Sequence, residues 1–229
     1  MAYNCLLLDF DETLVSFQES ELLSITKTYE KYKIPTTKEN TDFYSEINAG
    51  LWRDFEKGKI KKSAIERVRF QKVIEKFNVK NVSDEQMNRD YLGFLRSSAI
   101  LLDGALEFLQ DIEEHVTIAI VTNGIDAVQQ SRLKVSGVAD FVDGIFTSEK
   151  VGANKPDKRI FMAAMKTLGI ETPQKVLVVG DNIYSDIKGG INAGLDTCWV
   201  NFKNETNTTD IKPKYTVYDF TQLKNIILE

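Results

Sequence analysis

Histidine is almost absent from this sequence of 229 residues, because His115 is its only representative. A zinc centre held by several histidines is therefore excluded. A Ser-His-Asp triad would have to use His115, which follows a predicted helix and is poorly placed for catalysis. Neither a Walker phosphate loop nor a Gly-x-Gly-x-x-Gly fingerprint occurs, so the usual sequence support for a nucleotide cofactor is missing.

The sequence also lacks long apolar runs and a basic leader. No apolar stretch has the length of a membrane span, and Asp9 interrupts the apolar stretch near the N-terminus, so we expect neither a membrane partner nor a signal peptide. The two cysteines, Cys5 and Cys198, lie in apolar, strand-like segments. In a chain without a secretion signal, we expect them to be reduced core residues and the protein to be cytoplasmic.

Neither sign of charge dominates the chain. The 34 acidic and 29 basic residues give a net charge of −5, which argues against a general nucleic-acid binder. The hydrophobic fraction of 42% and the charged fraction of 28% are typical of globular proteins and exclude a disordered or collagen-like chain. The length fits one large domain or a core with an insertion, and we expect a monomer or a weak homo-oligomer.

Short apolar runs alternate with helical patterns over most of the chain. The runs show no polar alternation, which is typical of strands buried on both faces of a parallel sheet. The pattern therefore predicts an α/β fold with a Rossmann-like, doubly wound parallel sheet. The predicted strands are Cys5–Phe10, Thr117–Thr122, Val142–Thr147, Lys175–Gly180, Thr197–Phe202 and Tyr215–Phe220, and the predicted helices are Ala105–Glu114, Ile125–Ser136, Pro156–Leu168, Ser185–Ala193 and Thr221–Leu228.

One stretch interrupts this alternation. Residues 15–95 show helical patterns and no convincing strand, with capping-box sequences that begin at Ser63 and Ser83 and a possible helix stop at Gly58. We therefore predict an α/β core formed by residues 1–14 and 96–229, with an all-helical domain inserted after the first strand.

Polar side chains follow two of the predicted strands. Asp9 and Asp11 end the first strand, and Thr122 with Asn123 ends the second. The carboxyl ends of parallel strands meet at one edge of the sheet, where ligands bind. A hydroxyl and free N–H groups at a helix start suit a phosphate, although Thr122 or Asn123 could instead cap the helix that follows.

Two further motifs supply charge at the same predicted edge. Lys155 precedes Pro156, which suits the first turn of a helix and would place the lysine near an anion, although a solvated surface lysine is the alternative. Asp181 follows a buried strand, and Asp186 comes five residues later, where it could also cap a helix. Oxygen ligands gathered at one edge are what Mg²⁺ requires.

The order of these motifs resembles the haloacid dehalogenase superfamily. It runs Asp-x-Asp-x-Thr at Asp9, then Thr122, then Lys155-Pro156, then Gly-Asp at Asp181 with Asp186. The helical insertion is similar to the helical cap of that superfamily. Two segments, Asn48–Asp54 in the insertion and Gly189–Leu195, are similar to the noncanonical pyrimidine 5′-nucleotidase family.

This resemblance implies a Mg²⁺-dependent phosphomonoester hydrolase. Asp9 would be the nucleophile, and Asp11 would be the general acid and then the base. The ligands of Mg²⁺ would be Asp9, the main-chain carbonyl of Asp11, Asp181 and, directly or through water, Asp186. Thr122 and the Asn123 N–H would bind phosphoryl oxygens, and Lys155 would offset their charge.

The substrate implied by the resemblance is a pyrimidine nucleoside monophosphate. Phe17, Trp52 and Arg53 are candidates for its recognition, although Phe17 and Trp52 also suit the core of the helical domain. A phosphatase for sugar phosphates or phosphoglycolate is the strongest alternative. A phosphosugar mutase and a non-enzymatic phosphate-sensing protein also remain open. A dehalogenase is disfavoured because it would not need Asp11.

Overall fold

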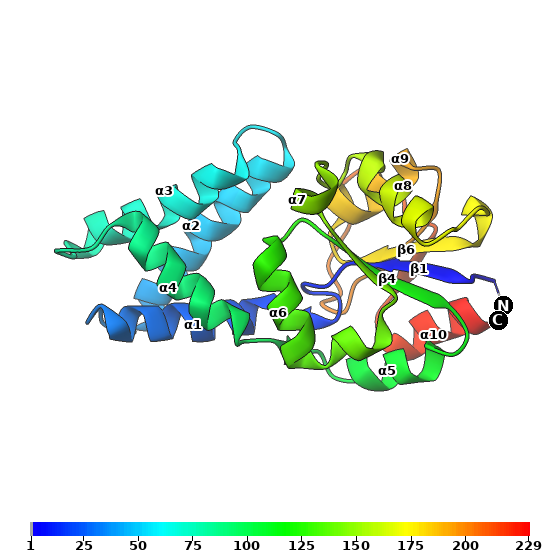
Figure 1. The fold of residues 1–229 in the computed structure, drawn as a ribbon, viewed down its shortest axis with the longest axis horizontal. Helices are drawn as coiled ribbons and strands as arrows, with labels where there is room; N and C mark the ends of the chain where they lie inside the picture. Colours follow the sequence, from blue (N-terminus) through cyan, green and yellow to red (C-terminus); the bar gives the residue numbers. More distant parts are fainter. Residues whose placement is uncertain (1) are drawn as a thin grey trace. The chain divides into compact units, whose positions relative to one another are not determined.

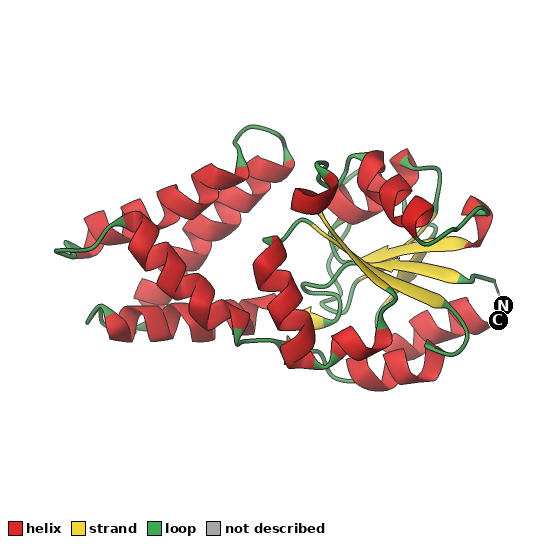
Figure 2. Cartoon of the chain, viewed as in Figure 1, coloured by secondary structure: helices red, strands yellow, loops and turns green. Residues whose placement is uncertain are grey.

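The computed structural model describes residues 2–229, which form two compact units (Figures 1 and 2). Of the described residues, the first unit comprises 2–16 and Ile100–Glu229, and the second comprises Phe17–Ala99. Within the described residues, we find no helix with both the length and the apolar character that a bilayer crossing requires.

A short two-stranded ribbon lies where the chain leaves and re-enters the first unit. Val15–Ser16 (β2) pairs antiparallel with Ile100–Leu101 (β3). The helical patterns of residues 15–95 predict no strand there, and β2 corrects this prediction. A strand of two residues is too short to give an apolar run. The pairing ties both ends of the insertion to the first unit.

A six-stranded parallel sheet forms the centre of the first unit, in the order β5-β4-β1-β6-β7-β8. From β1 the chain proceeds outward through β4 and β5, and then outward on the other side through β6, β7 and β8. The direction therefore reverses beside β1, which is where open α/β sheets bind ligands. The strands are β1 (Cys5–Leu8), β4 (Thr117–Thr122), β5 (Gly144–Thr147), β6 (Val176–Gly180), β7 (Asp196–Val200) and β8 (Tyr215–Val217).

Both faces of this sheet are covered by helices, which explains why its strands are apolar throughout. Helices α5, α6 and α10 lie on one side of the sheet and α8 lies on the other (Figure 1). Leu6 and Leu8 of β1 pack in one core cluster with residues of α5, α6 and α10, while Cys5 and Leu7 pack in another with residues of α8. Cys5 and Cys198 are buried free thiols, and burial raises the pKa of each to about 12. The helices are α5 (Ala105–Ile112), α6 (Asp126–Ser136), α7 (Ser148–Val151), α8 (Lys158–Thr167), α9 (Lys188–Asn192) and α10 (Phe220–Leu228), with 3-10 turns at Val138–Phe141 and Pro173–Lys175 and a π-helical turn at Ile183–Ile187.

Two predicted helix starts are wrong by a few residues. Helix α8 begins at Lys158 and is capped by Asp157, whose side chain accepts from the Arg159 N–H, so Pro156 lies before the helix. Helix α3 starts ahead of Ser63, which therefore cannot cap it. The prediction at Ser83 is confirmed, because its hydroxyl accepts from the Gln86 N–H at the start of α4.

The second unit consists of four helices around an aromatic core. The buried rings of Tyr44, Phe70 and Tyr91 contact one another, with centroids 5.3–5.5 Å apart. Contacts of this kind add to the free energy gained from burying the rings. The helices are α1 (Phe17–Lys31), α2 (Lys38–Glu56), α3 (Lys62–Phe77) and α4 (Asp84–Arg96).

A buried polar chain crosses this core, with one residue from each helix. Glu21 of α1 accepts from Asn48 of α2 at 2.5 Å, Asn48 accepts from Arg69 of α3 at 3.0 Å, and Arg69 donates to Asn88 of α4 at 2.6 Å. The guanidinium carbon of Arg69 also lies 4.8 Å from the Tyr91 ring centroid. Buried polar groups lower stability unless they are hydrogen-bonded. These four side chains are hydrogen-bonded together only when the four helices are aligned as observed, so the hydrogen bonds favour this one arrangement.

Removing the arginine should therefore destabilise the second unit. We expect Arg69→Ala to lower the free energy of unfolding by about 3 kcal/mol, because Asn48 and Asn88 lose a charged donor and a large buried side chain is removed. Urea denaturation measures the loss. The matched control is Arg67→Ala, two residues away with its side chain 64% exposed, which should cost less than about 0.5 kcal/mol. Equal losses of stability in Arg69→Ala and Arg67→Ala would show that the buried hydrogen bonds of Arg69 do not stabilise the second unit.

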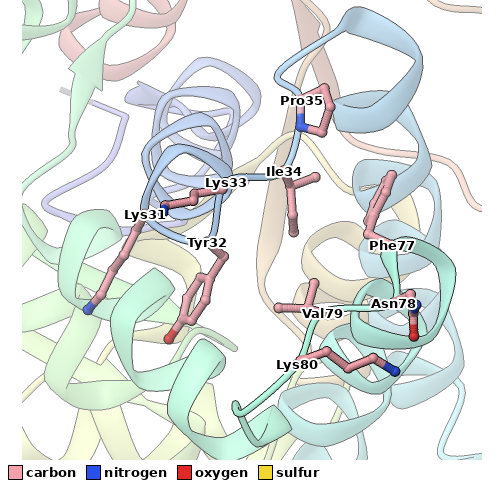
Figure 3. A pocket seen from close by; sticks show the side chains of 9 residues that line it. All are labelled: Lys31, Tyr32, Lys33, Ile34, Pro35, Phe77, Asn78, Val79 and Lys80. Atoms are coloured by element: carbon pink, nitrogen blue, oxygen red, sulfur yellow. The ribbon is translucent and has the colours of Figure 1, made fainter.

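One pocket of the second unit, with a volume of about 410 Å³, lies between the α1–α2 and α3–α4 connections (Figure 3). Ile34, Phe77 and Val79 line it, whereas the amines of Lys31 and Lys80 point in opposite directions. Lys31 is paired with Asp90 at 2.6 Å. Lys31 and Lys80 therefore do not converge on a single anion.

Candidate active site

Four chain segments meet at the carboxyl edge of the parallel sheet, beside the point where strand order reverses. Asp9 directly follows β1, Thr122 ends β4, and Asp181 directly follows β6. Lys155 comes from the loop between α7 and α8, which follows β5. The parallel arrangement is what brings these residues, distant in sequence, to one place.

Lys155 is the charged centre of this edge. Only 3% of its side chain is exposed, and its amine lies 2.6 Å from a carboxylate oxygen of Asp9 and 2.6 Å from one of Asp186. Burial by itself would lower the pKa of Lys155, but the two carboxylates outweigh it and raise the pKa above its usual value. The amine is therefore a fixed positive charge.

The side chain of Asn123 holds the backbone of Lys155 from both sides. Its amide donates to the Lys155 carbonyl at 3.0 Å, and its oxygen accepts from the Lys155 N–H at 2.8 Å. Asn123 is buried, so these bonds are shielded from water. The end of β4 thereby fixes the loop that carries the lysine.

Three carboxylates gather around the lysine. Ligand oxygens of Asp9, Asp181 and Asp186 lie within 4.8 Å of one another. Burial raises the pKa of Asp9 to about 7 against the opposing effect of Lys155, and burial with the charges of Asp186 and Asp9 raises the pKa of Asp181 well above its usual value. Three carboxylates and one ammonium leave two negative charges in excess, which suits a divalent cation with oxygen ligands such as Mg²⁺.

The position of Asp186 depends on the turn after β6. One oxygen of Asp186 accepts from the Asn182 N–H at 3.0 Å, while the Asn182 side chain accepts from the N–H groups of Tyr184 and Ser185. The π-helical turn thereby directs Asp186 back toward the strand end. Gly180 leaves room for this, because a Cβ there would collide with the Asp186 carboxylate.

Asp11 is held by two residues of α6. Arg132 donates to one carboxylate oxygen at 2.5 Å, and Gln129 donates to the other at 2.8 Å. The Gln129 amide also donates to the Thr122 hydroxyl at 3.0 Å, as does the Gly124 N–H at 3.0 Å. The side chain of Arg132 is fully buried, whereas that of Asp11 is 27% exposed.

Comparison with known proteins identifies the family. Residues 3–194 match the family model described as haloacid dehalogenase-like hydrolase. The chain belongs to this family of hydrolases. Two bacterial relatives match it over nearly their whole length: the pyrimidine 5′-nucleotidase YjjG of Escherichia coli (strain K12), 34% identical over 99% of each chain, and the pyrimidine 5′-nucleotidase PynA of Streptococcus pneumoniae (strain ATCC BAA-255 / R6), 32% identical over 99% of this chain and 98% of the relative.

A solved structure extends the comparison to three dimensions. The HAD-hydrolase YfnB of Bacillus subtilis, in a crystal structure bound to magnesium, is 33% identical to this haloacid dehalogenase-like hydrolase and superposes with a TM-score of 0.92 over 100% of both chains. The predicted α/β fold is therefore confirmed, and the family expected from the sequence motifs is the one that the comparisons show.

The structure also decides between local alternatives for the predicted site residues of this hydrolase. Lys155 is buried and ion-paired, not solvated. Neither Thr122 nor Asn123 caps α6, whose N-cap is Ile125. Asp186 accepts from Asn182 and faces Lys155, so it does not cap α9.

The residues proposed for substrate recognition lie in the second unit of the hydrolase. Phe17 begins α1, and Trp52 and Arg53 lie in α2. Trp52 is half-buried, its ring packing edge-on against Phe55 with centroids 5.8 Å apart, and Arg53 is exposed. Their part in substrate recognition stays a prediction.

Sequence reasoning missed the two residues that hold Asp11. Gln129 and Arg132 are three positions apart, which places them on the same face of α6. Polar residues at this spacing usually lie on a solvated face, and only the fold shows that these two are buried.

Enlarging Gly180 should weaken the cation site without touching a carboxylate. We expect Gly180→Ala to displace Asp186 and to lower the affinity for Mg²⁺ by about 10- to 100-fold, as is typical when the groups that orient metal ligands are disturbed. Isothermal titration with MgCl₂ measures the affinity. Gly93→Ala is the control, because a Cβ at Gly93 meets nothing within 4 Å. Unchanged affinity in Gly180→Ala would show that Asp186 does not contribute to the site.

Proposed function

We propose that this hydrolase is a Mg²⁺-dependent phosphomonoester hydrolase that forms an aspartyl-phosphate on Asp9 and acts on pyrimidine nucleoside 5′-monophosphates. The observation that carries the proposal is the cluster of Asp9, Asp181 and Asp186 around the buried amine of Lys155. The cluster offers a carboxylate nucleophile, a fixed positive charge and carboxylate oxygens that can bind a divalent cation.

In the first half of the reaction, the aspartyl-phosphate forms and the alcohol leaves, and each residue has a separate role. A carboxylate oxygen of Asp9 attacks phosphorus, the new O–P bond forms, and the ester P–O bond breaks. The leaving alkoxide takes a proton from Asp11, whose side chain is 27% exposed. The Thr122 hydroxyl and the Asn123 N–H bind phosphoryl oxygens, and Lys155 offsets the charge on them.

The second half returns the enzyme to its starting state. Asp11, now ionised, removes a proton from a water molecule that attacks the phosphorus of the aspartyl-phosphate. The Asp9–phosphorus bond breaks, inorganic phosphate leaves, and Asp11 is protonated again. Mg²⁺ would be held by Asp9, the Asp11 carbonyl, Asp181 and Asp186, and when bound it reduces the repulsion between an anionic nucleophile and an anionic phosphate.

The choice of substrate is supported by the full-length relatives YjjG and PynA, both named as pyrimidine 5′-nucleotidases. Phe17, Trp52 and Arg53 are the candidates for recognising the nucleoside. The relatives named for other phosphate esters match about half of this chain, from 47% for a phosphoserine phosphatase of Thermus thermophilus to 56% for an N-acylneuraminate-9-phosphatase of Mus musculus. A sugar-phosphate phosphatase with the same catalytic residues is the second candidate.

A panel of phosphate esters tests the proposal. Phosphate release is measured with and without MgCl₂ from UMP, dTMP, AMP, glucose 6-phosphate and phosphoglycolate. Faster release from UMP and dTMP, abolished by chelation, supports both reaction and substrate class. Faster release from the sugar phosphate or phosphoglycolate would retain the reaction and reject the substrate. Release that persists without a divalent cation would reject the proposed chemistry.

A further inference from the structure

We infer that Gln129 and Arg132 are positioning residues that set the Asp11 carboxylate and the Thr122 hydroxyl in the orientations the reaction needs. The inference rests on the proposed function, since it assigns these two residues a part in the same reaction. It begins from the hydrogen bonds that link Arg132 and Gln129 of α6 to Asp11 and Thr122.

The orientation of the Gln129 amide follows from its neighbours. Arg132 donates to the Gln129 oxygen at 3.1 Å, and the same guanidinium nitrogen donates to Asp11. The amide nitrogen of Gln129 must then face Asp11 and Thr122, to which it donates at 2.8 and 3.0 Å. The reverse orientation would place the amide oxygen against a carboxylate and the NH₂ group against Arg132.

The consequence for Thr122 is a fixed direction of hydrogen bonding. A hydroxyl has two lone pairs and one hydrogen. Gln129 and the Gly124 N–H both donate to the Thr122 oxygen, so both lone pairs are used. The hydroxyl hydrogen remains, and Thr122 can serve a phosphoryl oxygen only as a donor. Gln129 thus makes Thr122 selective for an anion.

The consequence for Asp11 is a fixed side-chain position. Its two oxygens are held by different residues, which prevents rotation of the carboxylate. Arg132 is itself anchored, because it is fully buried and its guanidinium carbon lies 5.3 Å from the Phe10 ring centroid. Acid–base groups contribute only when placed within hydrogen-bonding reach of the reacting atom, so this anchoring matters to the rate.

Gly124 supports the same arrangement from the backbone. A Cβ at this position would lie 2.7 Å from the side chain of Gln129. Gly124→Ala therefore displaces the end of a flexible side chain and leaves every charge in place. It is a second way to disturb Gln129 in a protein that keeps its buried arginine.

Leaving-group dependence tests the role of Arg132. The alkoxide released from UMP needs a proton from Asp11, whereas p-nitrophenolate leaves readily without one. We expect Arg132→Met and Gln129→Glu to slow uridine release in a single turnover about 100-fold, and p-nitrophenol release from p-nitrophenyl phosphate less than about 10-fold. Arg132→Lys should restore part of the difference. Lys134→Met, an exposed position on the same helix, should change neither rate.

The double variant connects the effect to Asp11. Asp11→Asn should show the same preference for p-nitrophenyl phosphate, and adding Arg132→Met to it should shift that preference no further. If the arginine variants do not fold, as judged by circular dichroism, Gly124→Ala should reproduce the preference in a folded protein.

Three results would overturn the inference. One is an equal loss with both substrates in folded variants, which is the sign of a structural role alone. Another is an unchanged rate in Gln129→Glu and Gly124→Ala, and the third is a further shift in the double variant. Failure of the proposed function is distinguishable because it appears in the unmodified enzyme, as no preference for UMP in the panel of phosphate esters or as phosphate release that persists without a divalent cation.

Discussion

Asp9→Asn is expected to lower kcat for the preferred nucleotide by at least about 10⁴-fold, because the amide cannot form the covalent bond to phosphorus. Asn has nearly the same shape, and its side-chain oxygen can still accept from the Lys155 amine. The variant should therefore fold and retain substrate binding. Phosphate release at saturating substrate measures the loss, with a coupled assay sensitive enough to detect the residual rate.

The control for this variant is Asp140→Asn, which makes the same chemical change at an exposed position of the first unit. Its kcat should match that of the unmodified enzyme. A loss of less than about 10-fold in Asp9→Asn would assign the nucleophile elsewhere. A large loss accompanied by a collapsed melting curve would be explained by unfolding and would call for Asp9→Glu, which retains the charge but misplaces it.

Asp181→Asn is expected to have opposite effects with and without the metal ion. In metal-free protein at pH 8, it removes one of three crowded carboxylates and should stabilise the fold by about 2 kcal/mol. For a chain of this size, that corresponds to a rise in Tm of about 4–8 °C. With MgCl₂ present, the unmodified enzyme should gain stability and the variant should gain little, because it has lost a ligand.

The stabilisation should also depend on pH. The pKa of Asp181 is higher in the folded protein than in the unfolded chain. Above the pKa of the unfolded chain, the carboxyl group therefore loses its proton more readily when the protein is unfolded, and this lowers the free energy of unfolding. The stability gained in Asp181→Asn is therefore largest at high pH. It disappears as the pH falls toward about 4, the ordinary pKa of an aspartate side chain. Melting curves from pH 4 to 8 measure this. A metal-free variant less stable than the unmodified protein at pH 8 would contradict the account of a cation-deficient cluster.

The positions of the catalytic candidates were predictable because they depend on topology. A continuous apolar run such as Thr117–Thr122 predicts a strand, and the strand is observed with those bounds. Once the strands are parallel, the residues that follow them must share an edge. Asp9, Thr122 and Asp181 follow from that rule without knowledge of any side-chain contact.

What the sequence did not show depends on backbone detail and burial. The π-helical turn at Ile183–Ile187 brings Asp186 to Lys155. The sequence pattern predicts only a helix over Ser185–Ala193 and does not reveal this turn. Gln129 and Arg132 have the spacing of an ordinary polar helix face. Ser63 has the sequence of a capping box, yet the helix begins ahead of it at Lys62, because the capping preference is small compared with helix packing.

The covalent intermediate is the central claim, and trapping it is the most direct test. The Asp11→Asn variant with p-nitrophenyl phosphate should accumulate the phosphoenzyme, because this substrate needs no acid to form it and the variant lacks the base to hydrolyse it. After an acid quench, mass spectrometry of peptides should find phosphate on Asp9, labile to hydroxylamine as an acyl phosphate is. Phosphate on another residue would contradict the account, as would p-nitrophenol release without any phosphorylated peptide.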